Sequence, residues 1–199
     1  MFNIQTVCVK NMSITKRLFL LLTAQNVCYT DTRTRKGWRD MQYTILCVGK
    51  IKERFYSEAI AEYRKRLSRY AKTSIIEVAD EKTPDRASLL EEEQIRKKEG
   101  DRILAKLKDS MYVVALDIRG KEYDSESFAK HISDCMLQGK SHVVFVIGGS
   151  LGLHSSVLER ADERLSFSHF TFPHQLMRVI LLEQIYRANR ILNHEPYHK

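Results

Sequence analysis

Short apolar runs alternate with amphipathic segments from residue 43 to the end of the chain, and this alternation constrains the fold more than any other feature. The runs have the length of buried strands, and the segments between them repeat apolar residues every three or four positions, as helices do. Alternating strands and helices predict an α/β fold with a mainly parallel sheet covered by helices on both faces. The predicted strands are residues 43–48, 74–79, 112–117, 142–147 and 165–167, and the predicted helices are residues 53–70, 88–107, 125–137, 153–161 and 175–192.

The character of the chain changes at Met41. The first 40 residues hold seven Lys and Arg against two acidic residues and show no clear periodicity. Their apolar run, residues 18–22, is too short to span a membrane, and no small-residue cleavage site follows it. We therefore interpret residues 1–40 as an N-terminal extension outside the native domain, with a genuine targeting leader as the alternative. Residues 41–199 then form one domain with a single core.

Cysteine usage indicates a reducing compartment. Cys47 lies in an apolar strand and Cys135 in a helix, and no C-x-x-C pair occurs. Cysteines in such positions are typical of buried, reduced thiols. With no membrane-spanning segment, this predicts a cytoplasmic protein.

The most apolar strand, residues 143–147, ends in a glycine-rich turn, residues 148–152. Ligands of parallel sheets bind beyond the carboxyl ends of the strands. Paired glycines also remove the Cβ atoms that keep a ligand away from backbone N–H groups. The turn therefore predicts a cofactor site, although a tight turn without a ligand would need the same glycines. Its spacing matches neither the G-x-G-x-x-G of dinucleotide folds nor a phosphate-binding P-loop.

The last predicted helix, residues 175–192, has apolar residues around nearly its whole circumference. One sheet cannot cover such a helix, so a second surface must bury the rest. A second copy of the chain in a two-fold homodimer is the commonest solution. A helix wedged within its own domain is the alternative.

An unusual polar and aromatic segment precedes that helix. Phe167, Phe170 and Phe172 are predicted to wall an apolar pocket. His169 and His174 have no Cys, Asp or Glu at ligand spacing nearby, so no metal site is predicted. Arg178 places a cation one turn into an otherwise apolar helix, and an ordinary surface arginine is the alternative.

Several blocks together resemble one family. They are Gly49-Lys50 after the first strand and residues 115–121 (ALDIRGK), 146–153 (VIGGSLGL), 165–178 (LSFSHFTFPHQLMR) and 196–199 (PYHK). In this order they are similar to the bacterial methyltransferases that modify N3 of pseudouridine in large-subunit ribosomal RNA, which are minimal members of the SPOUT superfamily. The resemblance spans residues 41–199 and includes nothing in residues 1–40.

The resemblance implies a C-terminal trefoil knot, an exception to the rule that chains do not knot. It also implies that S-adenosyl-L-methionine binds in a bent shape at a homodimer interface. The family's cofactor contacts match Leu116, Gly148, Phe167, Ser168, His169, Phe170, Thr171 and Phe172 in this chain. Adenine needs an apolar slot with backbone partners, and glycine turns beside phenylalanines supply one.

The implied substrate is a pseudouridine of 23S ribosomal RNA within the ribosome. Its N3 nitrogen must lose a proton before it attacks the methyl group, and a cation would stabilise the resulting anion. Arg178 is the predicted cation, and His174 or His198 is the predicted proton acceptor. Tyr197 is expected to stack on a base, with His198 and Lys199 near phosphates.

Two other functions compete with this interpretation. An NAD(P)-dependent oxidoreductase would need G-x-G-x-x-G after the first strand, where this chain has Val48-Gly49-Lys50-Ile51-Lys52. A non-catalytic RNA-binding protein of the ribosome stays open, and it predicts no binding of S-adenosylmethionine.

Overall fold

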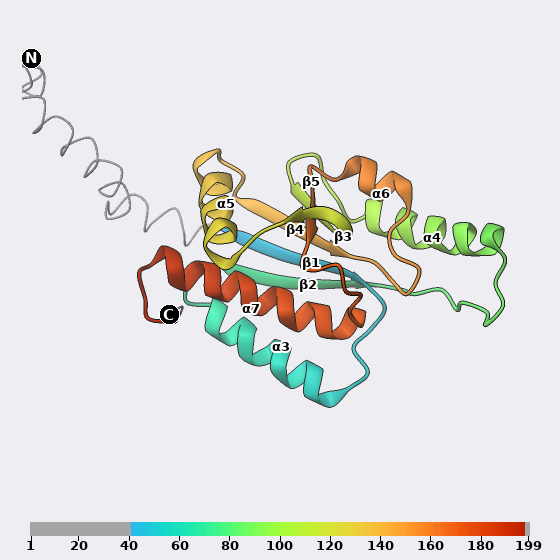
Figure 1. Ribbon diagram of the computed structural model, residues 1–199, viewed down its shortest axis with the longest axis horizontal. Coiled ribbons are helices and arrows are strands. Elements are labelled where there is room, and N and C mark those ends of the chain that lie inside the picture. The colour runs from blue at the N-terminus through green and yellow to red at the C-terminus, as the bar shows by residue number, and fades with distance from the viewer. Residues whose placement is uncertain (1–40, 198–199) are drawn as a thin grey trace, which may run out of the picture. The chain divides into compact units, whose positions relative to one another are not determined.

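The computed structural model describes residues 41–197, which form a five-stranded sheet flanked by helices (Figure 1). All strand pairs are parallel, in the order β2-β1-β4-β3-β5, so the predicted α/β class is confirmed. The strands are β1 (Gln42–Val48), β2 (Lys72–Val78), β3 (Tyr112–Glu122), β4 (His142–Ile147) and β5 (Glu163–Ser166). The helices are α3 (Arg54–Leu67), α4 (Leu89–Leu104), α5 (Ser125–Leu137), α6 (Ser155–Arg160) and α7 (His174–Leu192).

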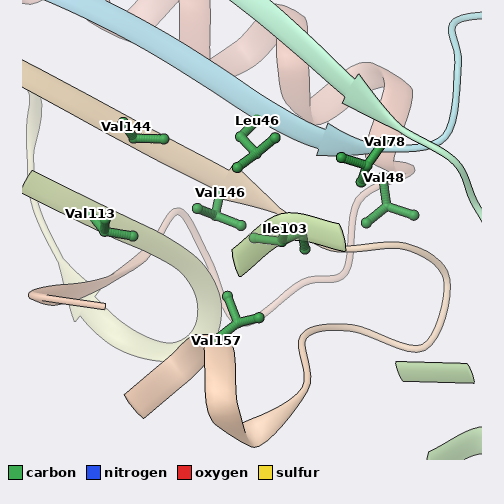
Figure 2. Close-up of a cluster of buried hydrophobic side chains, with 8 residues drawn as sticks. All are labelled: Leu46, Val48, Val78, Ile103, Val113, Val144, Val146 and Val157. Atoms are coloured by element: carbon green, nitrogen blue, oxygen red, sulfur yellow. The ribbon is translucent and has the colours of Figure 1, made fainter. Parts of the chain in front are cut away.

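Helices bury both faces of the sheet. On one face, Ile103 of α4 and Val157 of α6 pack on a cluster of strand side chains (Figure 2). The strand members of that cluster are Leu46, Val48, Val78, Val113, Val144 and Val146. Because side chains alternate along a strand, Phe145 points to the other face, where its ring centroid lies 6.4 Å from that of Phe128 in α5. Burial on both faces explains why the strands read as continuous apolar runs.

Local signals fix the starts of two helices. Ser88 and Glu91 form a capping box at the start of α4, in which the backbone N–H of Ser88 donates to Glu91 Oε2 at 2.8 Å. Asp124 caps α5 by accepting from the backbone N–H of Ser127 at 2.6 Å. Both devices satisfy N–H groups that have no partner inside the helix. The predicted starts at residues 88 and 125 agree with them to within one residue.

Strands β3 and β5 differ from the prediction. β3 continues to Glu122, five residues beyond the predicted end, and β5 is Glu163–Ser166 where residues 165–167 were expected. Leu165 pairs with both Leu116 and Lys121, so β3 bends around β5 (Figure 1). A Cβ on Gly120 would lie 2.6 Å from the backbone of Arg164 and Leu165, so only glycine permits this crossing. A threaded C-terminal segment needs such close passage, and the trefoil knot itself stays a prediction.

A polar cluster fastens the edge strand β5. Tyr123 and Tyr112 donate their hydroxyl protons to Glu163 at 2.6 and 3.0 Å, and His131 Nε2 of α5 lies 2.7 Å from Glu163 Oε2. Hydrogen bonds with Cys135 and Glu163 raise the pKa of His131 to about 9. Burial alone would raise the pKa of Glu163, but its hydrogen bonds with His131 and Tyr123 outweigh that and lower it to about 2. Both groups are therefore charged near pH 7, and the pair ties α5 to the sheet edge.

Helix α7 is largely covered by its own chain. It lies between α3 and α5 on the sheet, and Leu181, Leu182 and Ile185 are fully buried (Figure 1). The alternative of a helix wedged within its domain therefore accounts for most of its apolar circumference. Its remaining side exposes part of Leu176 and Ile180. The homodimer stays a prediction.

Both cysteines of the domain are free and buried. Burial raises the pKa of the Cys47 thiol to about 12, which leaves it unreactive near neutral pH. No helix within residues 41–197 is long and apolar enough to cross a bilayer. The predictions for residues 1–40 fall outside the described residues.

Candidate active site at the carboxyl end of the sheet

A cavity of about 700 Å³ opens at the carboxyl ends of β4 and β5, beside the middle of β3. Its walls come from the middle of β3, the glycine turn after β4, the loop before α7 and the first turn of α7. The volume lies within the range of small-molecule and cofactor sites. The position is the one that a parallel sheet predicts for a ligand.

The glycine turn lines this cavity and folds back on itself. The backbone N–H of Gly152 donates to the carbonyl of Gly149 at 3.1 Å, and Gly152 has a φ of 82°. A Cβ on Gly148 would lie 2.8 Å from the backbone of Gly152. The glycines are therefore required by the turn itself, and they also bring its backbone to the cavity wall.

Seven of the eight predicted cofactor residues line the cavity. They are Leu116, Gly148, Phe167, Ser168, Phe170, Thr171 and Phe172. His169 does not line it, because its side chain is 92% exposed and its Nε2 lies 3.6 Å from Glu122 Oε1. Phe170 lines the cavity but is 78% exposed, so one wall of the site is open in the single chain.

Glu99 of α4 supports the glycine turn, and sequence reasoning missed it. The residue is only 5% exposed, and a Cβ on Gly149 would lie 2.8 Å from its Oε2. Its Oε1 accepts from the backbone N–H of Glu81 at 3.0 Å, and Oε2 has no partner among the described residues. Burial raises the pKa of this carboxyl. Nothing in the sequence separates Glu99 from the exposed acids of the same helix, because only the tertiary contact with Gly149 marks it.

His174 begins α7 and lines the cavity, as predicted for a proton acceptor. Burial and the nearby Arg178 lower its pKa, so the ring is neutral near pH 7. Its Nδ1 is buried without a partner in the described part of the chain. A Cβ on Gly49 would lie 3.5 Å from the His174 ring, so the connection after β1 packs against it.

Arg178 is fully buried and does not line the cavity. Its Nη1 donates to Glu77 Oε1 at 2.7 Å, and its Nη2 donates to the carbonyls of Val48 and Gly49 at 2.9 and 2.8 Å. The alternative of a surface arginine is therefore wrong. The guanidinium ties α7 to the ends of β1 and β2, one turn behind His174.

Tyr197 lies far from the cavity of its own chain. Its hydroxyl donates to Glu183 Oε1 at 3.2 Å, and its ring centroid lies 5.1 Å from that of Tyr186. Glu183 and Tyr186 follow His174 by nine and twelve residues in α7, so Tyr197 lies roughly 14–18 Å from His174 along the helix axis. One chain thus does not bring them together. His198 and Lys199 lie outside the described residues.

No three His, Cys, Asp or Glu side chains within residues 41–197 form a metal-binding group. The cavity instead offers backbone groups, apolar walls, one neutral imidazole and the charged residues Asp117, Arg119 and Arg164. Together with the parallel sheet, this defines an α/β protein with a site for an organic cofactor.

Comparisons with known proteins identify the family. The family model described as "Predicted SPOUT methyltransferase" matches residues 41–198, and the chain belongs to this family. Over 159 residues it is 61% identical to the ribosomal RNA large subunit methyltransferase H of Clostridium botulinum and 58% identical to that of Clostridium perfringens. Each match covers 80% of this chain and 100% of the relative.

Solved structures are more distant. A probable methyltransferase of Bordetella pertussis has a TM-score of 0.48 at 11% identity, covering 80% of this chain and 99% of that one. The SpoU methyltransferase AviRb of Streptomyces viridochromogenes, in complex with AdoMet, has a TM-score of 0.39 at 12% identity. The match covers 83% of this chain and 63% of that one. Membership in a family of methyltransferases supports the predicted cofactor, S-adenosyl-L-methionine.

Proposed function

We propose that the protein transfers a methyl group from S-adenosyl-L-methionine to N3 of a pseudouridine in 23S ribosomal RNA, in the cytoplasm and on the ribosome. The observation that carries this proposal is the 61% identity to a ribosomal RNA large subunit methyltransferase H over that relative's whole length. Catalysis is favoured over passive RNA binding because the chain also has a cavity of cofactor size beside its glycine turn.

The cofactor is proposed to lie in this cavity, with its adenine against Leu116 and the phenylalanines and its polar edge on the backbone near Gly148. His169 stands between two lining residues with its side chain directed away, so we propose only a backbone contact for it. The sulfonium is already activated when it binds. The protein mainly has to hold nucleophile, methyl group and sulfur in line, which positioning alone can accelerate.

His174 is the proposed proton acceptor for N3. It lines the cavity, and its lowered pKa keeps the imidazole neutral and able to accept a proton near pH 7. Arg178 is proposed to act mainly by position, because its Nη atoms already bond to Glu77, Val48 and Gly49. It would hold the first turn of α7, and with it His174, against the end of the sheet.

The proposed active site is completed by a second copy of the chain. Tyr197 packs against Glu183 and Tyr186, roughly 14–18 Å along α7 from His174 at the cavity, too far to touch a nucleotide there. In a homodimer the tail residues Tyr197, His198 and Lys199 would serve the partner's cavity. The partly exposed Leu176 and Ile180 offer apolar surface for that contact.

The test uses purified protein, radiolabelled S-adenosylmethionine and two ribosome preparations, one with pseudouridine at the target position and one with uridine there. Label is expected in the 23S RNA of the first preparation only. His174→Ala should lower kcat by about 10²-fold or more while cofactor affinity, measured by calorimetry, stays within about twofold. Ribosome binding without cofactor binding or label would favour the non-catalytic alternative, and equal labelling of both preparations would overturn the pseudouridine assignment.

A further inference from the structure

The end of α3 and its connection to β2 form a strongly basic segment. Residues 64–72 (RKRLSRYAK) contain five basic residues and no acidic one. All five side chains, those of Arg64, Lys65, Arg66, Arg69 and Lys72, are exposed. Residues 41–197 as a whole hold 25 Lys and Arg against 23 Asp and Glu, so this concentration of charge is local.

The helix dipole does not account for the whole segment. Arg64, Lys65 and Arg66 stand in the last turn of α3, where cations are favourable, but Arg69 and Lys72 lie beyond the helix. Arg66 pairs with Glu62 at 2.8 Å, and Arg69 pairs with Glu195 at 3.4 Å. Arg64, Lys65 and Lys72 have no ion pair within residues 41–197, so three exposed cations remain free to bind an anion.

Aromatic side chains join this basic surface to the C-terminal end of α7. The ring centroids of Tyr63 and Tyr186 lie 6.3 Å apart, and Tyr186 in turn contacts Tyr197. The Arg66 guanidinium carbon lies 5.5 Å from the Tyr63 ring centroid. α3 and α7 run side by side and end on the same side of the molecule (Figure 1). The basic surface is thus continuous with Tyr197, the first residue of the proposed substrate-binding tail.

We propose that this basic surface, formed by Arg64, Lys65, Arg66, Arg69 and Lys72, binds the phosphate backbone of the ribosomal RNA that flanks the target nucleotide. The inference rests on the proposed function for the identity of the RNA. Closely spaced phosphates release counterions when such cations bind them, and this supplies affinity without sequence readout. Because the surface lies at the end of α7 opposite its own cavity, it would hold RNA whose target nucleotide enters the cavity of the partner copy.

Binding to ribosomes tests the surface directly. The variant Arg64→Ala/Lys65→Ala/Lys72→Ala removes the three unpaired cations. Its matched control, Lys97→Ala/Lys106→Ala/Lys108→Ala, removes three exposed lysines on and just after α4, across the sheet. Affinity for purified ribosomes is measured by co-sedimentation from about 50 to 200 mM salt. Thermal melting and calorimetric titration with S-adenosylmethionine verify that both variants keep their fold and cofactor site.

The basic-surface variant should bind ribosomes at least about tenfold more weakly at 0.1 M salt. The slope of log affinity against log salt should fall by about 2, which corresponds to about 0.7 for each lost contact. The control should stay within about twofold. If the triple variant is poorly folded, Lys65→Glu compared with Lys97→Glu makes the same comparison with one exposed residue each.

Equal ribosome affinities for the basic-surface variant and its control would overturn the proposed RNA-binding role of the basic surface. The proposed function would still stand if the wild type methylates ribosomes. Failure of the wild type to bind ribosomes at the lowest salt would also overturn it. If only the basic-surface variant loses ribosome binding and the wild type transfers no methyl group, the proposed role of the basic surface is supported and the proposed function is refuted.

Discussion

Replacing Arg178 by alanine tests whether this buried cation acts by position or by direct contact with the reaction. The guanidinium is 0% exposed and makes three hydrogen bonds, one to the Glu77 carboxylate and two to carbonyls at the end of β1. Alanine would leave all three acceptors without this donor and open a space behind the first turn of α7. Lysine would keep the charge, but it cannot reproduce the fork of the guanidinium.

The expected loss in the free energy of unfolding follows from the geometry of the ion pair. Removing one partner of a buried ion pair costs about 3–5 kcal/mol. The Glu77 side chain is 32% exposed, so water partly compensates its charge, and we expect the low end, about 3 kcal/mol. For a domain of this size the melting temperature should fall by about 6–12 °C. Arg54→Ala is the matched control, because that side chain is 92% exposed and its pair with Glu58 is worth at most about 0.5 kcal/mol.

The assay combines thermal and denaturant unfolding with methyl transfer to ribosomes, normalised to folded protein. Arg178→Ala should lose both stability and kcat, by about 10²-fold for kcat, and Arg178→Lys should recover part of each. A melting temperature within about 1 °C of wild type combined with lost activity would refute the positioning argument and favour direct contact with substrate. Full activity in a stable variant would refute both roles.

Three further outcomes are expected. Gly148→Ala should weaken S-adenosylmethionine binding at least about tenfold, because its Cβ would lie 2.8 Å from the Gly152 backbone; unchanged calorimetric affinity would remove the turn from the site. The raised pKa of His131, about 9 against 6.5 unfolded, stabilises the fold fully below about pH 6.5 and loses that effect as pH rises through about 9. Melting temperatures of wild type and His131→Asn should therefore converge between about pH 6.5 and 10, and a constant difference would contradict the ion pair with Glu163. Deleting residues 1–40 should leave melting and methyl transfer unchanged, whereas lost activity would give that segment a part in RNA binding.

The sequence by itself determined the fold class and most of the cavity wall. Strands buried on both faces must be apolar along their whole length, so their positions could be recognised without knowing their partners. Parallel strands bring their carboxyl ends to one edge of the sheet. The turn at Gly148 and the loop at Phe167 therefore had to meet, although they follow different strands.

Only the tertiary structure decided what the buried polar groups do, because their partners are distant in sequence. The periodicity of α7 says that Arg178 interrupts an apolar helix, but not that its guanidinium bonds to Val48, 130 residues earlier. Glu99 resembles the exposed acids of α4 until Gly149 packs against it. The packing of Tyr197 against Glu183 and Tyr186 of α7 also keeps it away from the cavity of its own chain. Hydrophobic burial leaves a local pattern, whereas the satisfaction of a buried polar group depends on contacts that form only when the whole chain has folded.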